Sequence, residues 1–314
     1  MSKSTLSYVC KRVLIAVLTL FIILSVLFVM LKCMPGTPFN DEKLSETQKA
    51  AIFAKYGLDQ PIYVQFFTYI KNMISGDFGT SFGIQKNMEV MNLVKNRIPI
   101  SFGIGLSAVF VGTIIGILLG IFAALHNNSL GDTLATVFSV LGVSIPSFVM
   151  GLLLLLLLGV EIPVFPIFFD SKNVIMSSVL PVMALSLSVI ANVARFTRSE
   201  MIAVLATDYI ALAEAKGLSK KTIISKHAIR NTLIPVITIL GPIMVNLMTG
   251  SMVLETIFAI PGLGSLLVNA ITVNDYNVVL AVSFLYSILY IVMMLIIDLS
   301  YGLIDPRIRL AKGA

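Results

Sequence analysis

The sequence predicts an all-α integral membrane protein with six transmembrane helices and a small folded cap after the first helix. Of its 314 residues, 57% are hydrophobic and 12% are charged, which is outside the range of soluble domains. Six apolar stretches are long enough to cross about 30 Å of hydrocarbon at about 1.5 Å per residue. Lys and Arg gather in the connections of one side, so the net charge of +6 reflects membrane topology and not a nucleic acid partner.

The predicted spans share a long run of apolar residues with almost no charge. They cover residues 13–31, 100–125, 133–160, 174–194, 234–253 and 278–299. The first run is too long for the apolar region of a signal peptide, and no small-x-small cleavage site follows it, so we expect an uncleaved span. Pro146 interrupts the third span and Pro181 the fourth. Such breaks suit a translocation path or fixed kinks, and the sequence leaves both open.

Topology follows from the basic residues. The connections that share a side with the N-terminus contain thirteen Lys and Arg, and the short connections of the other side contain only Lys172. Another eight lie in the outer connection 32–97, which is long enough to be exempt from the rule. We therefore expect a multi-pass protein of the cell membrane, in contact with lipid, with both termini and the loop 195–234 in the cytoplasm.

Three parts are predicted along the chain. Residues 1–31 form the cytoplasmic N-terminus and the first helix, and residues 32–97 form the extracytoplasmic cap with short helices. Residues 98–314 form a five-helix core that contains the loop 195–234 and an outer segment at 254–277.

The part of the chain from Ile100 onward is mostly apolar, and the loop 195–234 is its only sizeable polar, basic stretch. Thr207 or Asp208 can cap a helix over 209–216, and Gly217 suits the left-handed residue that ends such a helix. Ser219 can cap a second helix that runs to about Ile229.

Two features of this loop indicate a partner surface. The alanines at 211, 213 and 215 leave one face of the first helix nearly bare of side chains. Lys220 and Lys221 lie in a first helical turn, where the macrodipole disfavours cations, so an acidic or polar partner accounts for them better than local stability does. The alternatives are a solvated loop and a DNA-reading helix-turn-helix, and the latter lacks a linker that would carry it to a duplex.

Two further patterns concern the spans and the outer side. Gly112, Gly116 and Gly120 form one helical stripe, which predicts close helix packing without a catalytic role. The outer segment 254–277 combines turn residues with many apolar ones, which favours a re-entrant or interfacial segment over an ordinary surface loop.

The loop resembles the EAA loop of ABC-importer permeases, in the form used by the first-permease type of the oligopeptide and dipeptide (nickel) branch. The motifs are Ala211-Leu212-Ala213-Glu214-Ala215-Lys216-Gly217, His227-Ala228-Ile229-Arg230-Asn231 and Leu233-Ile234-Pro235. In that family the loop is the coupling helix, which docks in a groove of a cytoplasmic ATPase subunit. Ala211 stands where the general motif has Glu, and Glu214 lies one turn later. The residues that the resemblance assigns to ATPase coupling are Asp208, Tyr209, Ala211, Ala213, Glu214, Ala215, Lys216, Gly217, Lys220, Lys221, His227 and Arg230.

The outer segment resembles the gate region of the same branch. The residues that carry this likeness, or follow it, are Glu255, Phe258, Pro261, Gly262, Gly264 and Asp275. Further landmarks of the branch lie at 34–38, 56–61, 76–81, 97–99 and 305–309. The resemblance thus covers nearly the whole chain and implies the type I ABC importer permease fold.

The function implied is that of one of two transmembrane subunits of a binding-protein-dependent importer of oligopeptides or dipeptides. The implied partners are a second homologous permease, two ABC ATPase subunits and an extracytoplasmic peptide-binding protein. The chain has no Walker A loop, no catalytic constellation and no metal-ligand spacing, so ATP and Mg²⁺ are expected only in the ATPase subunits. The alternatives are a nickel or metal-chelate importer permease, and a secondary transporter or channel, which the scarcity of ionisable groups within the spans disfavours.

Overall fold

The structure is a computed structural model that describes residues 3–33, 57–248 and 252–304, together with residues 47, 50, 53 and 54. The motifs at 34–38 and 305–309 lie outside the described residues. Regular structure in the described part is helical, apart from one isolated antiparallel bridge between Thr80 and Glu89. Five helices of the described part are long and apolar enough to cross a membrane, and a bent pair is a possible sixth. The predicted all-α membrane architecture is therefore confirmed.

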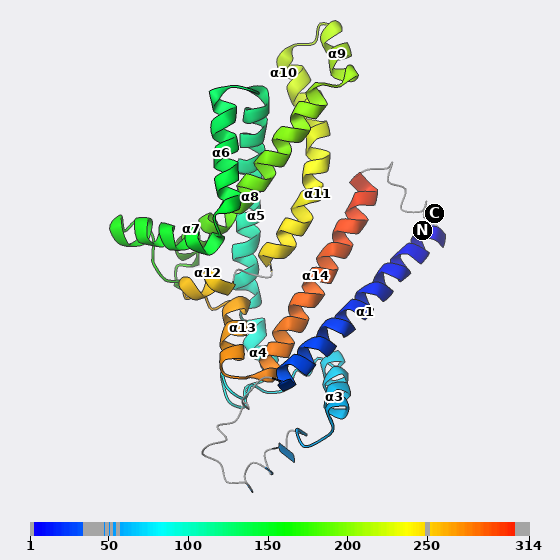
Figure 1. The fold of residues 1–314 in the computed structure, drawn as a ribbon, viewed down its shortest axis with the longest axis vertical. Coiled ribbons are helices and arrows are strands. Elements are labelled where there is room, and N and C mark those ends of the chain that lie inside the picture. Colours follow the sequence, from blue (N-terminus) through cyan, green and yellow to red (C-terminus); the bar gives the residue numbers. More distant parts are fainter. Residues whose placement is uncertain are drawn as a thin grey trace. The chain divides into compact units, whose positions relative to one another are not determined.

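The chain folds as two compact units. Unit 1 contains residues 1–100 and 261–291, and unit 2 contains residues 101–260 and 292–314. The helices of unit 1, coloured blue to cyan and orange in Figure 1, are α1 (Lys3–Cys33), α3 (Ile62–Ile74), α4 (Val90–Lys95), α13 (Leu263–Thr272) and the first part of α14 (Tyr276–Ile304).

Aromatic contacts hold α3 against α1 in unit 1. The ring of Phe66 lies edge-on to Phe28, with ring centres 5.3 Å apart, and edge-on to Phe21 at 5.7 Å. Pairs of this geometry contribute about 0.5–1.5 kcal/mol beyond the burial of their area. Apolar residues of the long outer connection therefore pack on the first membrane helix.

Unit 2 is a bundle around α8 (Val174–Leu205). Its other helices are α5 (Ile98–Leu125), α6 (Leu130–Ser144), α7 (Ser147–Leu154), η2 (Leu155–Glu161), α9 (Asp208–Ala215), α10 (Lys220–Thr222), η3 (Ile223–Ala228), α11 (Ile229–Met248) and α12 (Met252–Ile257). Helices α6 and α11 pack along α8, and α7 crosses it (Figure 1). The turn between α5 and α6 and the loop of α9 and α10 lie at the same end of this unit (Figure 1).

The third predicted span is not one straight helix. Helices α6 and α7 are bent by 103° at a break that contains Ile145 and Pro146. Pro146 cannot donate a backbone hydrogen bond and its ring opposes helix continuation, so the α6 helix ends before it. The predicted interruption at Pro146 is therefore confirmed, and the structure gives it as a bend of 103°.

Helix α5 approaches α8 through its glycines. A Cβ atom added at Gly112 would lie 2.5 Å from the Cβ of Val189, and one at Gly116 would lie 2.8 Å from the Cβ of Val193. Any side chain at these positions would have to displace the backbone of α5 or α8. The stripe thus lies directly against the central helix of the bundle.

Candidate functional site: the α9–α11 docking segment

The α9 helix, Asp208–Ala215, ends in a Schellman motif built on a glycine. Gly217 has a φ of +76°, its N–H donates to the carbonyl of Glu214 at 2.9 Å, and the N–H of Leu218 donates to the carbonyl of Ala213 at 3.2 Å. These bonds satisfy two carbonyls that the helix end would otherwise leave unpaired. The glycine predicted to end the helix therefore sets the direction of the chain toward α10.

One face of α9 is anchored in the protein's own core. Ile210 and Ala213 are buried in a cluster that also contains Met201 of α8 and two residues of η3, Ile223 and Ala228. Ala213 is only 6% exposed, so the three alanines of the loop do not form the common bare face that the sequence suggested. Residues two apart on a helix point to nearly opposite sides, and only Ala211 and Ala215 share the exposed face.

The other face of the segment is exposed and partly apolar. The exposed fractions of Tyr209, Leu212 and Leu218 are 41%, 56% and 40%. Charged residues predicted for ATPase coupling surround them and are also exposed: Asp208, Glu214, Lys216, Lys220, Lys221 and Arg230. A firmly anchored helix that exposes apolar side chains among charged ones is a candidate protein-binding surface.

The second helix begins as predicted but does not end as predicted. The Ser219 hydroxyl accepts a hydrogen bond from the Thr222 N–H at 3.3 Å, which is the expected N-cap. The helix then passes through the π-helical turns of η3 into α11 without a break, so the predicted end near Ile229 was wrong. At the start of α9, the Thr207 hydroxyl donates to the Val204 carbonyl at 2.6 Å and does not cap the helix through its side chain.

A polar contact joins the two helices of the segment. The Asn231 side-chain amide donates to the Tyr209 hydroxyl at 3.0 Å and to the His227 carbonyl at 3.0 Å. Through Asn231, α9 is fixed to the first turn of α11. A displacement of α9 would therefore act directly on a membrane helix.

Two residues of the predicted gate segment lie in unit 2. Glu255 of α12 is 5% exposed and accepts a hydrogen bond from the Ser101 hydroxyl at 2.7 Å. Phe258 is fully buried, and its ring would lie 3.3 Å from a Cβ added at Gly151 of α7. Gly151 was not among the predicted packing glycines, because it stands alone on its helix face.

The other predicted gate residues lie in unit 1. Pro261 and Gly262 precede α13, and the Gly262 N–H donates to the Ser265 hydroxyl at 3.2 Å. Gly264 is buried in the first turn of α13. Asp275 is fully buried at the turn between α13 and α14.

Unit 1 also contains a cavity of about 820 Å³, lined by parts of α1, α3 and the start of α14. Phe28, Gln65, Tyr69 and Asn277 are among its lining residues. The Tyr69 hydroxyl has no hydrogen-bond partner within the described residues, and burial raises the pKa of Tyr69. The lining also includes residues of the landmarks at 56–61 and 76–81. These motifs did not predict a cavity, because its lining comes from three separate stretches of the chain.

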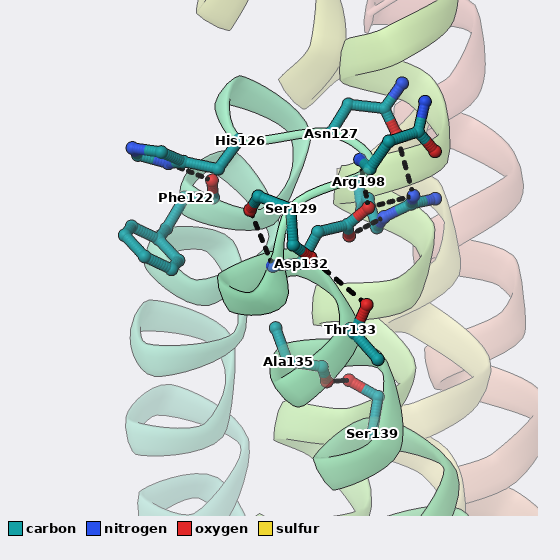
Figure 2. A network of polar contacts seen from close by, with 10 residues as sticks. Phe122, His126, Asn127, Ser129, Asp132, Thr133, Ala135, Ser139 and Arg198 are labelled. Atoms are coloured by element: carbon teal, nitrogen blue, oxygen red, sulfur yellow. Dashed lines mark hydrogen bonds and ion pairs between the residues drawn. The ribbon is translucent and has the colours of Figure 1, made fainter.

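The sequence also gave no sign of an ion pair between Asp132 of α6 and Arg198 of α8 (Figure 2). The two residues are 66 positions apart, and neither belongs to a recognisable motif. Among the described residues, no group of three or more His, Cys, Asp or Glu side chains could hold a metal ion.

The apolar helices, with α9 anchored at one end of unit 2, define a multi-pass membrane protein. Residues 116–310 match the family model described as the binding-protein-dependent transport system inner membrane component, and residues 5–105 match the model of its N-terminal region. The chain belongs to this family of binding-protein-dependent transport permeases. It is a transport subunit and not an enzyme.

Close relatives cover the chain from end to end. The chain is 43% identical over 303 residues to the dipeptide transport system permease protein DppB of Lactococcus lactis, covering 96% of this chain and 99% of the relative. It is 42% identical to DppB of Bacillus subtilis, covering 97% and 98%. It is 40% identical to the oligopeptide transport system permease protein OppB of Escherichia coli K12, covering 97% and 99%.

A solved structure shares the fold. The inward-facing MetNI methionine ABC transporter superposes with a TM-score of 0.56 at 16% identity, covering 68% of this chain and 97% of that chain. At this identity the likeness concerns the fold alone. The ABC importer permease fold implied by the sequence motifs is confirmed.

Proposed function

We propose that the chain is one of two transmembrane subunits of an importer for oligopeptides or dipeptides. The relatives named above as dipeptide and oligopeptide permeases, similar over nearly the full chain, support this substrate class. The other subunits would be a second homologous permease, two ABC ATPases that bind ATP and Mg²⁺, and an extracytoplasmic peptide-binding protein. Both termini and the docking segment would face the cytoplasm, in agreement with the distribution of Lys and Arg.

The observation that carries the coupling role is the two-sided character of α9. Its inner face is fixed by Ile210 in the core, and its outer face exposes Leu212 by 56%. Exposed apolar residues beside basic ones suit a groove on an ATPase subunit, and the fixed inner face lets a force on α9 reach α8 and α11. The predicted gate residues would act on the outer side, where peptide enters from the binding protein.

Copurification and transport test the proposal. Purified in mild detergent, the tagged chain is expected to bring down a second permease and an ATPase pair. Proteoliposomes with the binding protein should take up a radiolabelled tripeptide only with hydrolysable ATP. Recovery of a homo-oligomer alone, or uphill uptake without ATP, would overturn it.

A matched pair of variants tests the docking surface. Leu212→Glu places a charge at the centre of the exposed face, so the ATPase subunits should dissociate and uptake should be lost. Leu130, which is 83% exposed in the first turn of α6 at the same end of unit 2, provides the control Leu130→Glu. An acidic residue suits that turn, and the ATPases should stay bound. Equal association of both variants would contradict docking through α9.

A further inference from the structure

The guanidinium of Arg198 joins α8 to the turn between α5 and α6 with a fork of charge-assisted hydrogen bonds. Its Nε donates to Asp132 Oδ1 at 2.5 Å and its Nη2 donates to Asp132 Oδ2 at 2.7 Å. The same Nη2 donates to Asn127 Oδ1 at 3.0 Å. Figure 2 shows how the three side chains converge from the turn and from α8. Bidentate pairs of this kind fix geometry as well as adding attraction.

The carboxylate is held in place from its own side too. Oδ2 of Asp132 accepts a hydrogen bond from the Asn128 N–H at 2.9 Å, and the Ser129 hydroxyl accepts one from the Asp132 N–H at 3.3 Å. Asp132 is only 4% exposed. A buried carboxylate needs a charged partner, so removal of Arg198 would leave an uncompensated charge at the start of α6.

The ion pair lies beside a close approach of α5 to α8 at Gly120. A Cβ added at Gly120 would lie 2.6 Å from the Ala194 carbonyl oxygen and 2.6 Å from the Thr197 Cβ. One turn further along α5, Ala124 packs in the same buried cluster as Met201 and Ile210. The pair therefore joins α6 to α8 close to the buried cluster that anchors α9.

Helix α6 is not adjacent to the docking segment along the chain, whereas α8 leads directly into α9 and η3 leads directly into α11. We propose that the Arg198–Asp132 pair is the positioning contact that makes α6, and through its bend α7, follow α8 when the docking segment is displaced. This inference rests on the proposed function. Neither residue touches substrate or ATP in this role; both act by transmitting movement.

The ratio of ATP hydrolysed to peptide imported is the readout that separates coupling from simple stability. In the reconstituted importer, Arg198→Gln should keep the ATPase rate within about twofold and lower uptake roughly tenfold, the range of a typical coupling between sites. The control Arg195→Gln changes an exposed arginine one turn earlier on the same helix and should leave the ratio unchanged. An unchanged ratio in Arg198→Gln would overturn the inference.

A second variant deals with poor folding. If Arg198→Gln does not assemble, the double variant Asp132→Asn with Arg198→Gln removes the unpaired buried charge and should assemble with its partners. Its ratio should remain raised, because two amides do not reproduce the ionic fork. A normal ratio in the assembled double variant would count against the inference.

A covalent tether provides the decisive experiment. Cysteines are placed at Asn127 and Arg198 in a chain with Cys10→Ser and Cys33→Ser, and a bifunctional thiol reagent links them. If the native pair makes the two elements move together, the link should bring uptake per ATP back toward the wild-type value. A link that blocks the remaining uptake, or leaves it unchanged, would overturn the inference. Absence of ATP-driven uptake in the wild-type assembly would instead refute the proposed function itself.

Discussion

The Ser81 hydroxyl donates a 2.5 Å hydrogen bond to Oδ2 of Asp275, 194 residues further along the chain. The backbone N–H groups of Phe82, Gly83 and Ile84 donate to the same oxygen at 3.0, 2.9 and 3.2 Å. A fully buried carboxylate thus organises a turn of the long outer connection against the turn between α13 and α14. Four donors on one oxygen make Asp275 a structural anchor of unit 1.

Replacement of Asp275 by Ala should destabilise the protein strongly. Three N–H groups and a hydroxyl, in a buried or partly buried place, would lose their acceptor, which costs roughly 2–4 kcal/mol. The thermal unfolding midpoint of the purified protein in detergent should fall by about 5 °C or more. Asp275→Asn keeps one acceptor oxygen and should lose less. An unchanged unfolding midpoint in Asp275→Ala would show that the carboxylate is not the anchor.

Gly217 and Gly103 form a matched pair for the left-handed turn of the docking segment. A Cβ at either glycine would meet nothing within 4 Å, but only Gly217 has a positive φ, at +76°. Gly217→Ala should therefore destabilise the protein by roughly 1–2 kcal/mol, whereas Gly103→Ala, exposed within α5, should stabilise it by roughly 0.5–1 kcal/mol. Thermal unfolding compares the two variants. The same sign for both would contradict the assigned backbone.

Gly116→Ala tests the approach of α5 to α8. Alanine favours a helix more than glycine does, but its Cβ would lie 2.8 Å from the Cβ of Val193 and 3.0 Å from the Ile190 carbonyl oxygen. Overpacking of this kind typically costs about 1–3 kcal/mol, so packing should outweigh propensity. A lower unfolding midpoint than that of Gly103→Ala is expected. A raised midpoint would mean that the two helices are not packed so closely.

The sequence was sufficient for features that depend on local chemistry. The length of apolar runs indicated the membrane helices, and Gly217 indicated the end of α9. The angles between helices could not be predicted in the same way. Pro146 marks where α6 ends, but the 103° turn into α7 depends on packing partners such as Leu254, whose Cδ2 would lie 2.2 Å from a Cβ at Gly151.

Polar pairs between distant parts of the chain were the main feature that the sequence did not predict. Asp132 read as a residue of a short connection and Arg198 as one charge of a basic loop, because no local pattern relates positions 66 residues apart. The orientation of Ala213 was misjudged for a simpler reason. Its place in the buried cluster follows from helical periodicity, which puts it on the same side as Ile210.

Reversal of Lys220 and Lys221 to Glu should weaken the binding of the ATPase subunits without lowering the stability of the permease. The two quantities can therefore be measured separately. Both lysines are exposed in the first turn after the Ser219 cap, where the helix dipole favours acidic residues. The thermal midpoint of the variant permease should therefore stay unchanged or rise. Its affinity for the ATPase subunits should fall at least tenfold if the lysines face an acidic or polar groove.

The salt dependence gives the second measurement of this prediction. Wild-type association should weaken between low and physiological ionic strength, and the double reversal should remove or invert that dependence. Lys172→Glu, an exposed change in the connection before α8, is the matched control and should behave as the wild type. Unaltered affinity in the double reversal would show that Lys220 and Lys221 lie outside the ATPase contact, and that docking depends on the apolar face of α9 alone.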